Sequence, residues 1–539
     1  MSVRVRFAPS PTGNVHIGNI RVAIYNWLFA RHEAGRFLLR IEDTDRTRST
    51  PQAIRNLLDV MDWLGLDCDE EPVYQSGRVE RHVAAAEKLL ANGHACKSTQ
   101  DEEGRQAILF RIPWDCAGLA NVQTLGDVDV SVHPEIPVCV DRKGLNFAQV
   151  SKKGKPVPAA ACLAGFQGLE IYNENERCLF RIEDHLDDIV GAGESFVLEH
   201  AKRLHFTRRQ VVFSDLIRGD LGKPLDSMKD FVIVRSDGSP VFHLANVCDD
   251  AAQEVTHIVR GDDHVENTYR HIFLHHALGI PVPQYAHLPM IVNAQGKPYS
   301  KRDGDAFVGD FRDKGFLPQA LLNYLALLGW SPGDDREKLS RDELCQLFTL
   351  DRVQRASAQM DVRKLTNLNG RYMAELPFAT FLDGCRAFLE CCAWWQDAAD
   401  GQTLRDVAAL MQSRTKRFID VQDWDYFFVD IPAYDEKAVR KFLCKEGIPE
   451  ALADVSDALP RAVFEPAALE TLVETVTERH GIKRGKLNQP LRVAVTGRTT
   501  GAGIFETMAV IGRERVLKRL EHAQTLAAEG RQDAPEESG

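Results

Sequence analysis

The fold of this chain is decided by residues 3–45, which read VRVRFAPSPTGNVHIGNIRVAIYNWLFARHEAGRFLLRIEDTD. Residues 3–7 alternate apolar and basic side chains, which predicts a short strand. Two prolines and a glycine follow within residues 8–13 and cannot continue a sheet. From His16 the apolar residues recur with a helical period, and residues 37–41 predict a second strand. Strand, turn, helix and strand in this order predict the start of a parallel α/β sheet.

A phosphate site is expected where that first helix begins. Ligands of open parallel sheets bind beyond the carboxyl ends of the strands, and a helix N-terminus favours anions through its free N–H groups and its dipole. Gly18 allows a flat group to approach the backbone, and His16 can donate a hydrogen bond to a phosphate oxygen. Taken alone, a histidine at a helix start is more often a cap or a surface residue, so the spacing leaves both interpretations open.

Length and composition limit the class of protein. A chain of 539 residues is too long for one core and predicts about three to five domains. A net charge of −12 argues against bulk electrostatic binding of nucleic acid, so RNA binding would need local basic patches. The twelve cysteines form no C-x-x-C pair, and we expect reduced thiols and no zinc. Without a signal pattern or a long apolar run, we expect a cytoplasmic protein that enters no membrane.

Two motifs in the right order carry a resemblance to a known family. RFAPSPTG-x-x-HIG followed by RIEDTD resembles the opening of glutamyl-tRNA synthetases, class I enzymes of the glutamate/glutamine branch. PYSKR, at residues 298–302, resembles the K-L-S-K-R form of the second class I signature, with Pro298 in place of the leading lysine and Lys297 before it. Residues 480–520 are similar to the carboxyl part of the same family. The family usually has a tyrosine where this chain has Phe242, which removes a hydroxyl from the expected amino-acid pocket.

The resemblance implies a glutamate–tRNA ligase. Such an enzyme uses ATP, with Mg²⁺ bound to it, to convert L-glutamate to glutamyl-adenylate, and then transfers the glutamyl group to the 3′ end of tRNA(Glu). Carried over position by position, the catalytic residues would be His16 and Lys301. The glutamate contacts would be Arg6, Ala8, Ser10, Glu42, Phe242 and Arg260. The ATP contacts would be His16, Gly18, Asp263, Ile291, Ser300, Lys301 and Arg302.

The fold implied is an α/β class I catalytic domain, with a Rossmann-like parallel sheet and an inserted acceptor-binding domain, followed by mostly α-helical stem-contact and anticodon-binding domains. We expect a strand, an Asp-Gly turn and a second strand in residues 231–250. We also expect mixed strands in residues 114–209, which match nothing typical of the family. The expected parts are the two catalytic halves 1–106 and 211–330, the inserted domain 107–210, the stem-contact domain 331–380, the anticodon-binding domain 381–528 and a disordered tail 529–539.

Several alternatives stay open. The enzyme could be a non-discriminating form that also charges tRNA(Gln), or a non-catalytic tRNA-binding paralogue, which Pro298 and Phe242 keep in consideration. A glutaminyl enzyme is disfavoured by the Ala8-Pro9-Ser10 string. A glutamyl transferase acting on a modified tRNA base is disfavoured by the length of chain beyond the second signature. The family expectation for the oligomeric state is a monomer.

Overall fold

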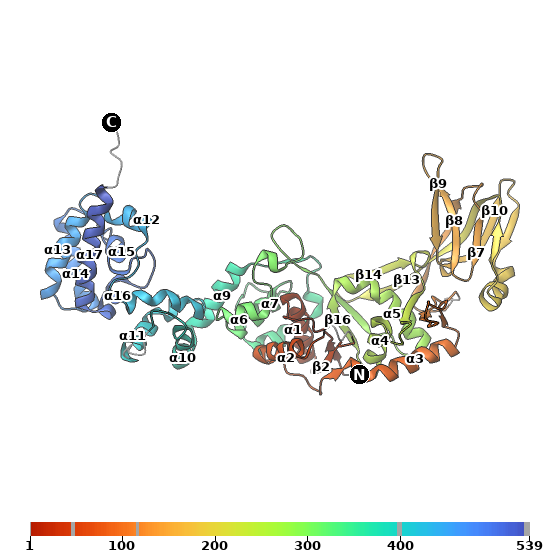
Figure 1. The fold of residues 1–539 in the computed structure, drawn as a ribbon, viewed down its shortest axis with the longest axis horizontal. Helices are drawn as coiled ribbons and strands as arrows, with labels where there is room; N and C mark the ends of the chain where they lie inside the picture. The colour runs from red at the N-terminus through yellow and green to blue at the C-terminus, as the bar shows by residue number, and fades with distance from the viewer. Residues whose placement is uncertain (1, 45–48, 115–117, 396–400, 484, 533–539) are drawn as a thin grey trace. The chain divides into compact units, whose positions relative to one another are not determined.

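The computed structural model describes residues 2–44, 49–114, 118–395, 401–483 and 485–532. The chain forms two compact units, of which the first comprises residues 1–309 and 325–360 and the second residues 310–324 and 361–539. Figure 1 follows both units by colour along the chain. Along the described residues, no helix is both long and apolar enough to cross a membrane.

The first unit opens as the sequence predicts. Strand β1 (Arg4–Phe7), helix α1 (Ile17–His32) and strand β2 (Arg36–Ile41) follow in order. The two strands are parallel, with Val5 opposite Phe37. On its other edge β2 pairs in parallel with a short strand, β3 (Val73–Tyr74). The next helices are α2 (Pro51–Leu64) and α3 (Val79–Ala91).

A second parallel block completes the nucleotide-binding core. Strands β16 (His257–Gly261) and β17 (Gln284–Leu288) are paired in parallel, and helix α5 (Val265–Leu278) connects them along the chain. The two blocks do not share a ladder, but β1 packs beside β16, and the Thr256 N–H donates to the Arg4 carbonyl over 2.9 Å. The carboxyl ends of β1, β2 and β16 therefore face a common space.

The prediction of a second strand after the Asp237-Gly238 turn is wrong. The turn exists, with Gly238 at φ +84°, but the following segment forms helix α4 (Phe242–Ala252). All residues from 244 to 250 are buried, polar and apolar alike, so the middle of the helix has no exposed polar face. The strand before the turn, β15 (Phe231–Val234), pairs with β5 (Ile108–Phe110), which pairs in turn with β4 (Ala95–Lys97).

The segment between the two blocks forms mixed strands, as expected. Its strands are β6 (Val122–Ser131), β7 (Val138–Asp141), β8 (Gly144–Val150), β9 (Pro156–Ala161), β10 (Phe166–Asn173), β11 (Cys178–Arg181), β12 (Phe196–Leu198), β13 (Ala201–Asp215) and β14 (Gly219–Pro224). The long strand β13 pairs with β6, β10 and β14, and its last residue, Asp215, pairs with Tyr285 of β17. These strands enclose a core of their own around Val138, Leu169 and Leu204. One continuous strand thus runs from the inserted sheet to the catalytic block.

Shorter elements connect the catalytic blocks to the rest of the chain. They are β18 (Ile291–Val292), β19 (Ala358–Gln359), α6 (Val308–Asp313), α7 (Pro318–Leu327) and α8 (Arg341–Leu347). The second unit is helical: α9 (Val362–Ala374), α10 (Phe378–Leu389), α11 (Gly401–Met411), α12 (Glu436–Ala438), α13 (Ile448–Ala458), α14 (Pro466–Arg479), α15 (Asn488–Thr496), α16 (Ile504–Ile511) and α17 (Arg513–Gln532).

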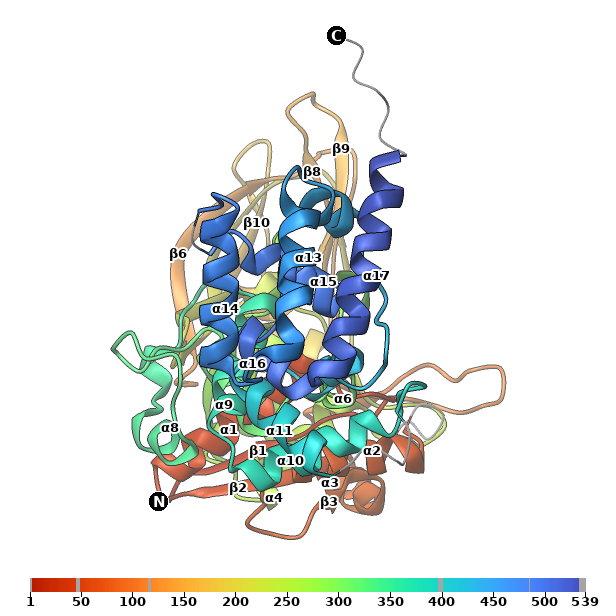
Figure 2. The same ribbon diagram turned by 90° about the vertical axis from the view of Figure 1, so that its left-hand side faces the viewer.

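Helices α13, α14 and α17 lie side by side in the second unit (Figure 2). Buried residues of these helices, such as Leu520, belong to one core cluster that also includes Phe381 and Trp424. Helix α17 continues to Gln532, so the tail expected from residue 529 begins with four helical residues. The rest of that tail, residues 533–539, lies outside the described residues.

Candidate active site

A cavity of about 680 Å³ lies where the two parallel blocks meet. Its walls come from the end of β1 and the following turn, the start of α1, the end of β2, helix α4 and the end of β16. The predicted site residues that line it are Arg6, Ala8, Ser10, His16, Gly18, Glu42, Phe242, Arg260, Asp263 and Ile291. Ser300, Lys301 and Arg302 are not part of its wall, although Pro298 and Tyr299 just before them are.

His16 caps the first helix and is held in one orientation. Its Nδ1 accepts the Gly18 N–H over 3.0 Å, which leaves the proton of the neutral ring on Nε2. Burial lowers the pKa of His16, against a hydrogen bond with the backbone of Tyr299. A side chain at Gly18 would place its Cβ 3.2 Å from the His16 ring. The helix start therefore presents a neutral imidazole beside an open stretch of backbone.

Lys301 approaches His16 from the second signature. It begins a short 3-10 turn whose first residues are fixed by Ser300, because the Ser300 Oγ donates to Asp303 over 2.9 Å. The Lys301 Nζ lies 5.9 Å from the centroid of the Phe307 ring, and that ring stands edge-on to His16 at 6.0 Å. The side chain of Lys301 is exposed. Residues of both signatures therefore lie within about 6 Å of one aromatic ring, that of Phe307.

Arg260 is a buried cation with an unused donor. It is 5% exposed, and its donors reach His287 Nε2 (3.2 Å), Thr268 Oγ1 (2.6 Å) and the His264 carbonyl (3.2 Å). Among the described residues, its Nη1 has no hydrogen-bond partner. Burial lowers the pKa of Arg260 to about 10, so the side chain remains a cation at neutral pH.

Asp215, the last residue of strand β13, orients Arg260 through His287. Asp215 at the end of that strand lies 2.6 Å from His287 Nδ1, and its carboxylate also accepts the His287 backbone N–H. His287 in turn accepts from Arg260 Nε. A buried chain of Asp215, His287 and Arg260 thus leads from the inserted sheet to the cavity.

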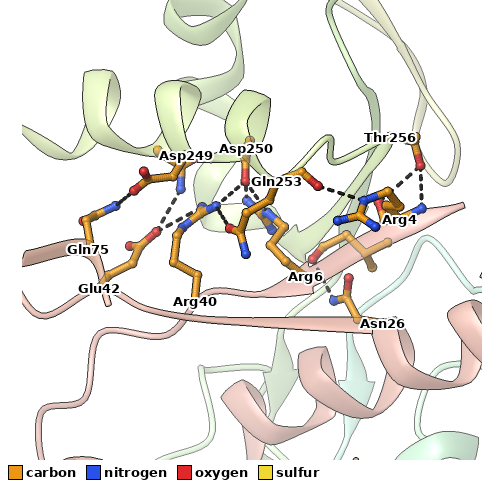
Figure 3. Close-up of polar contacts among 12 residues, drawn as sticks. Arg4, Arg6, Asn26, Arg40, Glu42, Gln75, Asp249, Asp250, Gln253 and Thr256 are labelled. Carbon is orange, nitrogen blue, oxygen red and sulfur yellow. Dashed lines mark hydrogen bonds and ion pairs between the residues drawn. The ribbon is translucent and has the colours of Figure 1, made fainter. Parts of the chain in front are cut away.

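Glu42 and Arg6 also line the cavity, and Figure 3 shows their polar contacts. Glu42 Oε1 accepts from Asn246 over 2.9 Å and lies 3.4 Å from Arg40 Nη2. Arg6 Nε donates to Asp250 over 2.9 Å, and Arg40 Nη1 donates to the same oxygen over 2.6 Å. Burial raises the pKa of Glu42. Burial alone would also raise the pKa of Asp250, but Arg40 and Arg6 hold it below its ordinary value.

Comparison with known proteins agrees with this geometry. A model described as tRNA synthetases class I (E and Q), catalytic domain, matches residues 2–107 and 172–367, and an anticodon binding domain matches residues 380–524. A glutamate–tRNA ligase 1 of Gluconacetobacter diazotrophicus is 38% identical over 96% of this chain and 99% of its own. The chain belongs to the glutamyl-tRNA synthetase family. The glutamate–tRNA ligase 1 of Caldanaerobacter subterraneus subsp. tengcongensis is 33% identical over 97% of both chains.

Solved structures of glutamyl-tRNA synthetases have the same fold. A glutamate–tRNA ligase from Elizabethkingia meningosepticum, crystallised with its amino acid, superposes with a TM-score of 0.69 at 26% identity over 97% of this chain and 99% of its own. The family, the fold class and the ligase function predicted from the sequence are confirmed. The protein is an enzyme that joins glutamate to tRNA and uses ATP as a substrate.

Sequence reasoning missed several residues of this synthetase site. Asn246 and Asp250 follow Phe242 at intervals of four residues, a stripe on one face of a helix, but the segment was predicted as a strand. His264 and Asn267 also line the cavity, and the Asn267 side chain lies 3.0 Å from His264 Nδ1. Their spacing of three residues at the start of α5 was the available signal.

Two further features concern possible metal ligands and the cysteine thiols. Across the described residues, no three His, Cys, Asp or Glu side chains are placed to hold a metal ion. The described cysteines are free thiols, and Cys116 lies outside the described residues.

Proposed function

We propose that this glutamyl-tRNA synthetase binds glutamate in the 680 Å³ cavity with one carboxylate at Arg260. The observation that carries the proposal is the buried Nη1 of Arg260, which has no partner in the described part of the chain. A guanidinium offers paired donors that match a carboxylate. An unsatisfied buried donor costs about 1–3 kcal/mol, and a bound carboxylate would relieve that cost.

The remaining contacts are assigned to other residues that line the cavity. Glu42 is positioned to accept the substrate ammonium, because its carboxylate faces the same cavity between Asn246 and Arg40. Arg6 would contact the second carboxylate, and Ala8 and Ser10 would frame the amino acid. The ring of Phe242 supplies an apolar wall where it stacks on His264 at 5.9 Å.

The first chemical step joins glutamate to the nucleotide. A carboxylate oxygen of glutamate attacks the α-phosphorus of ATP, the bond from that phosphorus to the bridging oxygen breaks, and pyrophosphate leaves with the electron pair. In the second step the terminal ribose hydroxyl of the tRNA attacks the activated carbonyl. AMP leaves, and the hydroxyl proton is released. The protein contributes position and charge to both steps.

His16 and Lys301 are proposed to stabilise the charge that grows on the phosphate oxygens. His16 donates from Nε2, and Lys301 supplies a cation beside it. Gly18, Asp263, Ile291, Ser300 and Arg302 would complete the ATP site. Mg²⁺ would arrive on the phosphates of ATP, since this ion is commonly bound through substrate phosphates and one or two carboxylates, and Asp263 lies at the cavity.

The tRNA is proposed to contact the domains expected from the sequence. In this proposal the acceptor stem meets residues 107–210, the stem-contact domain is 331–380, the anticodon-binding domain is 381–528, and the catalytic halves are 1–106 and 211–330. Support comes from the turn between β8 and β9, which exposes Lys152, Lys153 and Lys155 within a segment that is otherwise mainly acidic. Replacing the three lysines by glutamine should raise the KM for tRNA and weaken its salt dependence.

The decisive experiment measures glutamate-, ATP- and tRNA-dependent charging. We expect charging of tRNA(Glu) by a cytoplasmic monomer, and Arg260→Gln should raise the KM for glutamate about ten- to a hundredfold while the KM for ATP changes little. An unchanged glutamate KM would remove Arg260 from the amino-acid site. The same assay with tRNA(Gln) separates a discriminating enzyme from a non-discriminating one.

A further inference from the structure

Charged side chains are buried around the amino-acid end of the cavity. Arg6, Arg40 and Arg260 are cations, and Glu42 and Asp250 are anions; each is at most 6% exposed. A third buried anion, Asp215, reaches Arg260 through His287.

Asp250 is the centre of this arrangement (Figure 3). Its Oδ1 accepts from Arg6 and Arg40, and its Oδ2 accepts from Arg6 Nη2 over 3.3 Å. It is 2% exposed and does not line the cavity. Asp250 therefore acts on the two guanidinium groups and cannot touch the substrate.

The alternative acceptor for both arginines is Glu42. Arg40 Nη2 is already 3.4 Å from Glu42 Oε1, and the Arg6 side chain lines the same cavity. A buried guanidinium that loses its carboxylate will turn to the nearest remaining one, because an unpaired buried charge is costly. Without Asp250, the two arginines would cover the carboxylate that is proposed to receive the substrate ammonium.

We infer that Asp250 is the positioning residue of the glutamate pocket: by holding Arg6 and Arg40, it keeps Glu42 available for the substrate ammonium. The inference rests on the proposed function, because that function assigns the ammonium to Glu42. Asp250 joins helix α4 to β1 and β2, so one side chain sets the arrangement of three elements at the cavity.

The neighbouring residue provides a matched control. Asp249 is equally buried, but its carboxylate contacts His82 (3.0 Å), Gln75 (3.0 Å) and Arg78 (3.6 Å), away from the cavity. Asp249→Asn and Asp250→Asn make the same chemical change at adjacent positions of one helix. Both should lower stability, whereas Asp250→Asn alone should alter glutamate binding.

The test compares glutamate with glutarate, which has both carboxylates and no ammonium. Asp250→Asn should raise the KM for glutamate at least about tenfold and leave the KM for ATP within about twofold of wild type. Inhibition by glutarate should weaken less than about threefold, because glutarate does not need Glu42. Equal losses for glutamate and glutarate, or a loss as large in Asp249→Asn, would overturn the inference.

A double variant keeps the test valid if Asp250→Asn folds poorly. Arg40→Met with Asp250→Asn removes one charge of each sign from the cluster, so the net charge of the cluster stays that of wild type. Because the freed Arg40 is absent, this variant should recover at least a third of the lost glutamate affinity, and no recovery would contradict the inference. Glu42→Gln separates the two proposals: an unchanged glutamate KM there would refute the ammonium assignment, whereas a raised KM with a normal Asp250→Asn would refute only the role of Asp250.

Discussion

Each of the two units contains a buried arginine, and the two arginines differ in their hydrogen-bond partners. Arg519 in the helical unit is 0% exposed, and Arg260 in the catalytic unit is 5% exposed. Burial lowers the pKa of each to about 10. Arg519 donates to the backbone carbonyls of Asp430, Val495 and Val429, whereas Arg260 keeps its Nη1 unpartnered within the described chain. Burial of a cation therefore does not identify a site by itself; Arg260 differs from Arg519 in lining the cavity and in keeping one donor without a partner among the described residues.

The largest expected effect is on the free energy of unfolding when each of the two arginines is replaced by methionine. Arg519→Met should lower the free energy of unfolding by about 3 kcal/mol or more, because three buried carbonyls lose their donor. Arg260→Met should cost about 1 kcal/mol or less, since Thr268 Oγ1 and His287 Nε2 already lie 3.1 Å apart and can pair with each other. Denaturant unfolding of both variants measures the difference, and equal losses would show that Arg260 is a structural cation like Arg519.

The second largest expected effect is a fall in the free energy of unfolding of the catalytic unit at acidic pH. Burial lowers the pKa of His271 well below its usual value and that of His275 to about 4. Both rings stay neutral when folded but bind protons in the unfolded chain below about pH 6.5, so stability falls as the pH drops from about 6.5 towards the folded pKa values. The loss at pH 5.5 should be about 2–3 kcal/mol for the two rings together.

A single substitution isolates one of these rings. Neither nitrogen of His275 has a hydrogen-bond partner among the described residues, so His275→Leu should be tolerated. It should remove about 1.4 kcal/mol of the acid-induced loss when unfolding is followed at pH 7.5 and 5.5, the contribution of one ring, while other histidines with lowered pKa values such as His243 still contribute theirs. A slope identical to that of wild type would exclude His275 as a source of the pH dependence.

An exposed cation sharpens the contrast with the buried ones. Lys301 is at the surface, so Lys301→Ala should leave the unfolding free energy within about 0.5 kcal/mol. Adenylate formation should nevertheless fall at least about tenfold, because charge developing on the phosphate loses its partner. Pyrophosphate exchange at saturating tRNA measures this, with the exposed Lys297 changed to alanine as the control. Unchanged exchange would remove Lys301 from the mechanism.

The smallest expected effect concerns the apolar wall of the pocket. Phe242→Tyr should lower the KM for glutamate about fivefold, the value of one added hydrogen bond of about 1 kcal/mol. Charging at varied glutamate checks this. A raised KM would show that the ring packs against His264 too closely to accept a hydroxyl.

The sequence allowed the fold to be predicted where local patterns and family motifs agree. The strand, turn and helix around His16 followed from alternation, proline and helical period, and the structure brings ten of the predicted site residues to one cavity. Helix α4 was missed because residues 244–250 are buried on every side, so its polar stripe does not separate an exposed face from a core face. The pairing of Asp250 with Arg6 was also beyond prediction, because the two lie 244 positions apart in sequence and meet only through tertiary packing.

Strand β13 belongs to the inserted sheet and also to the surroundings of the cavity. It pairs with three other strands of the inserted segment, and the carboxylate of its last residue, Asp215, contacts His287, which accepts a hydrogen bond from Arg260. A displacement of the end of this strand would therefore move the guanidinium that is proposed to bind the substrate carboxylate.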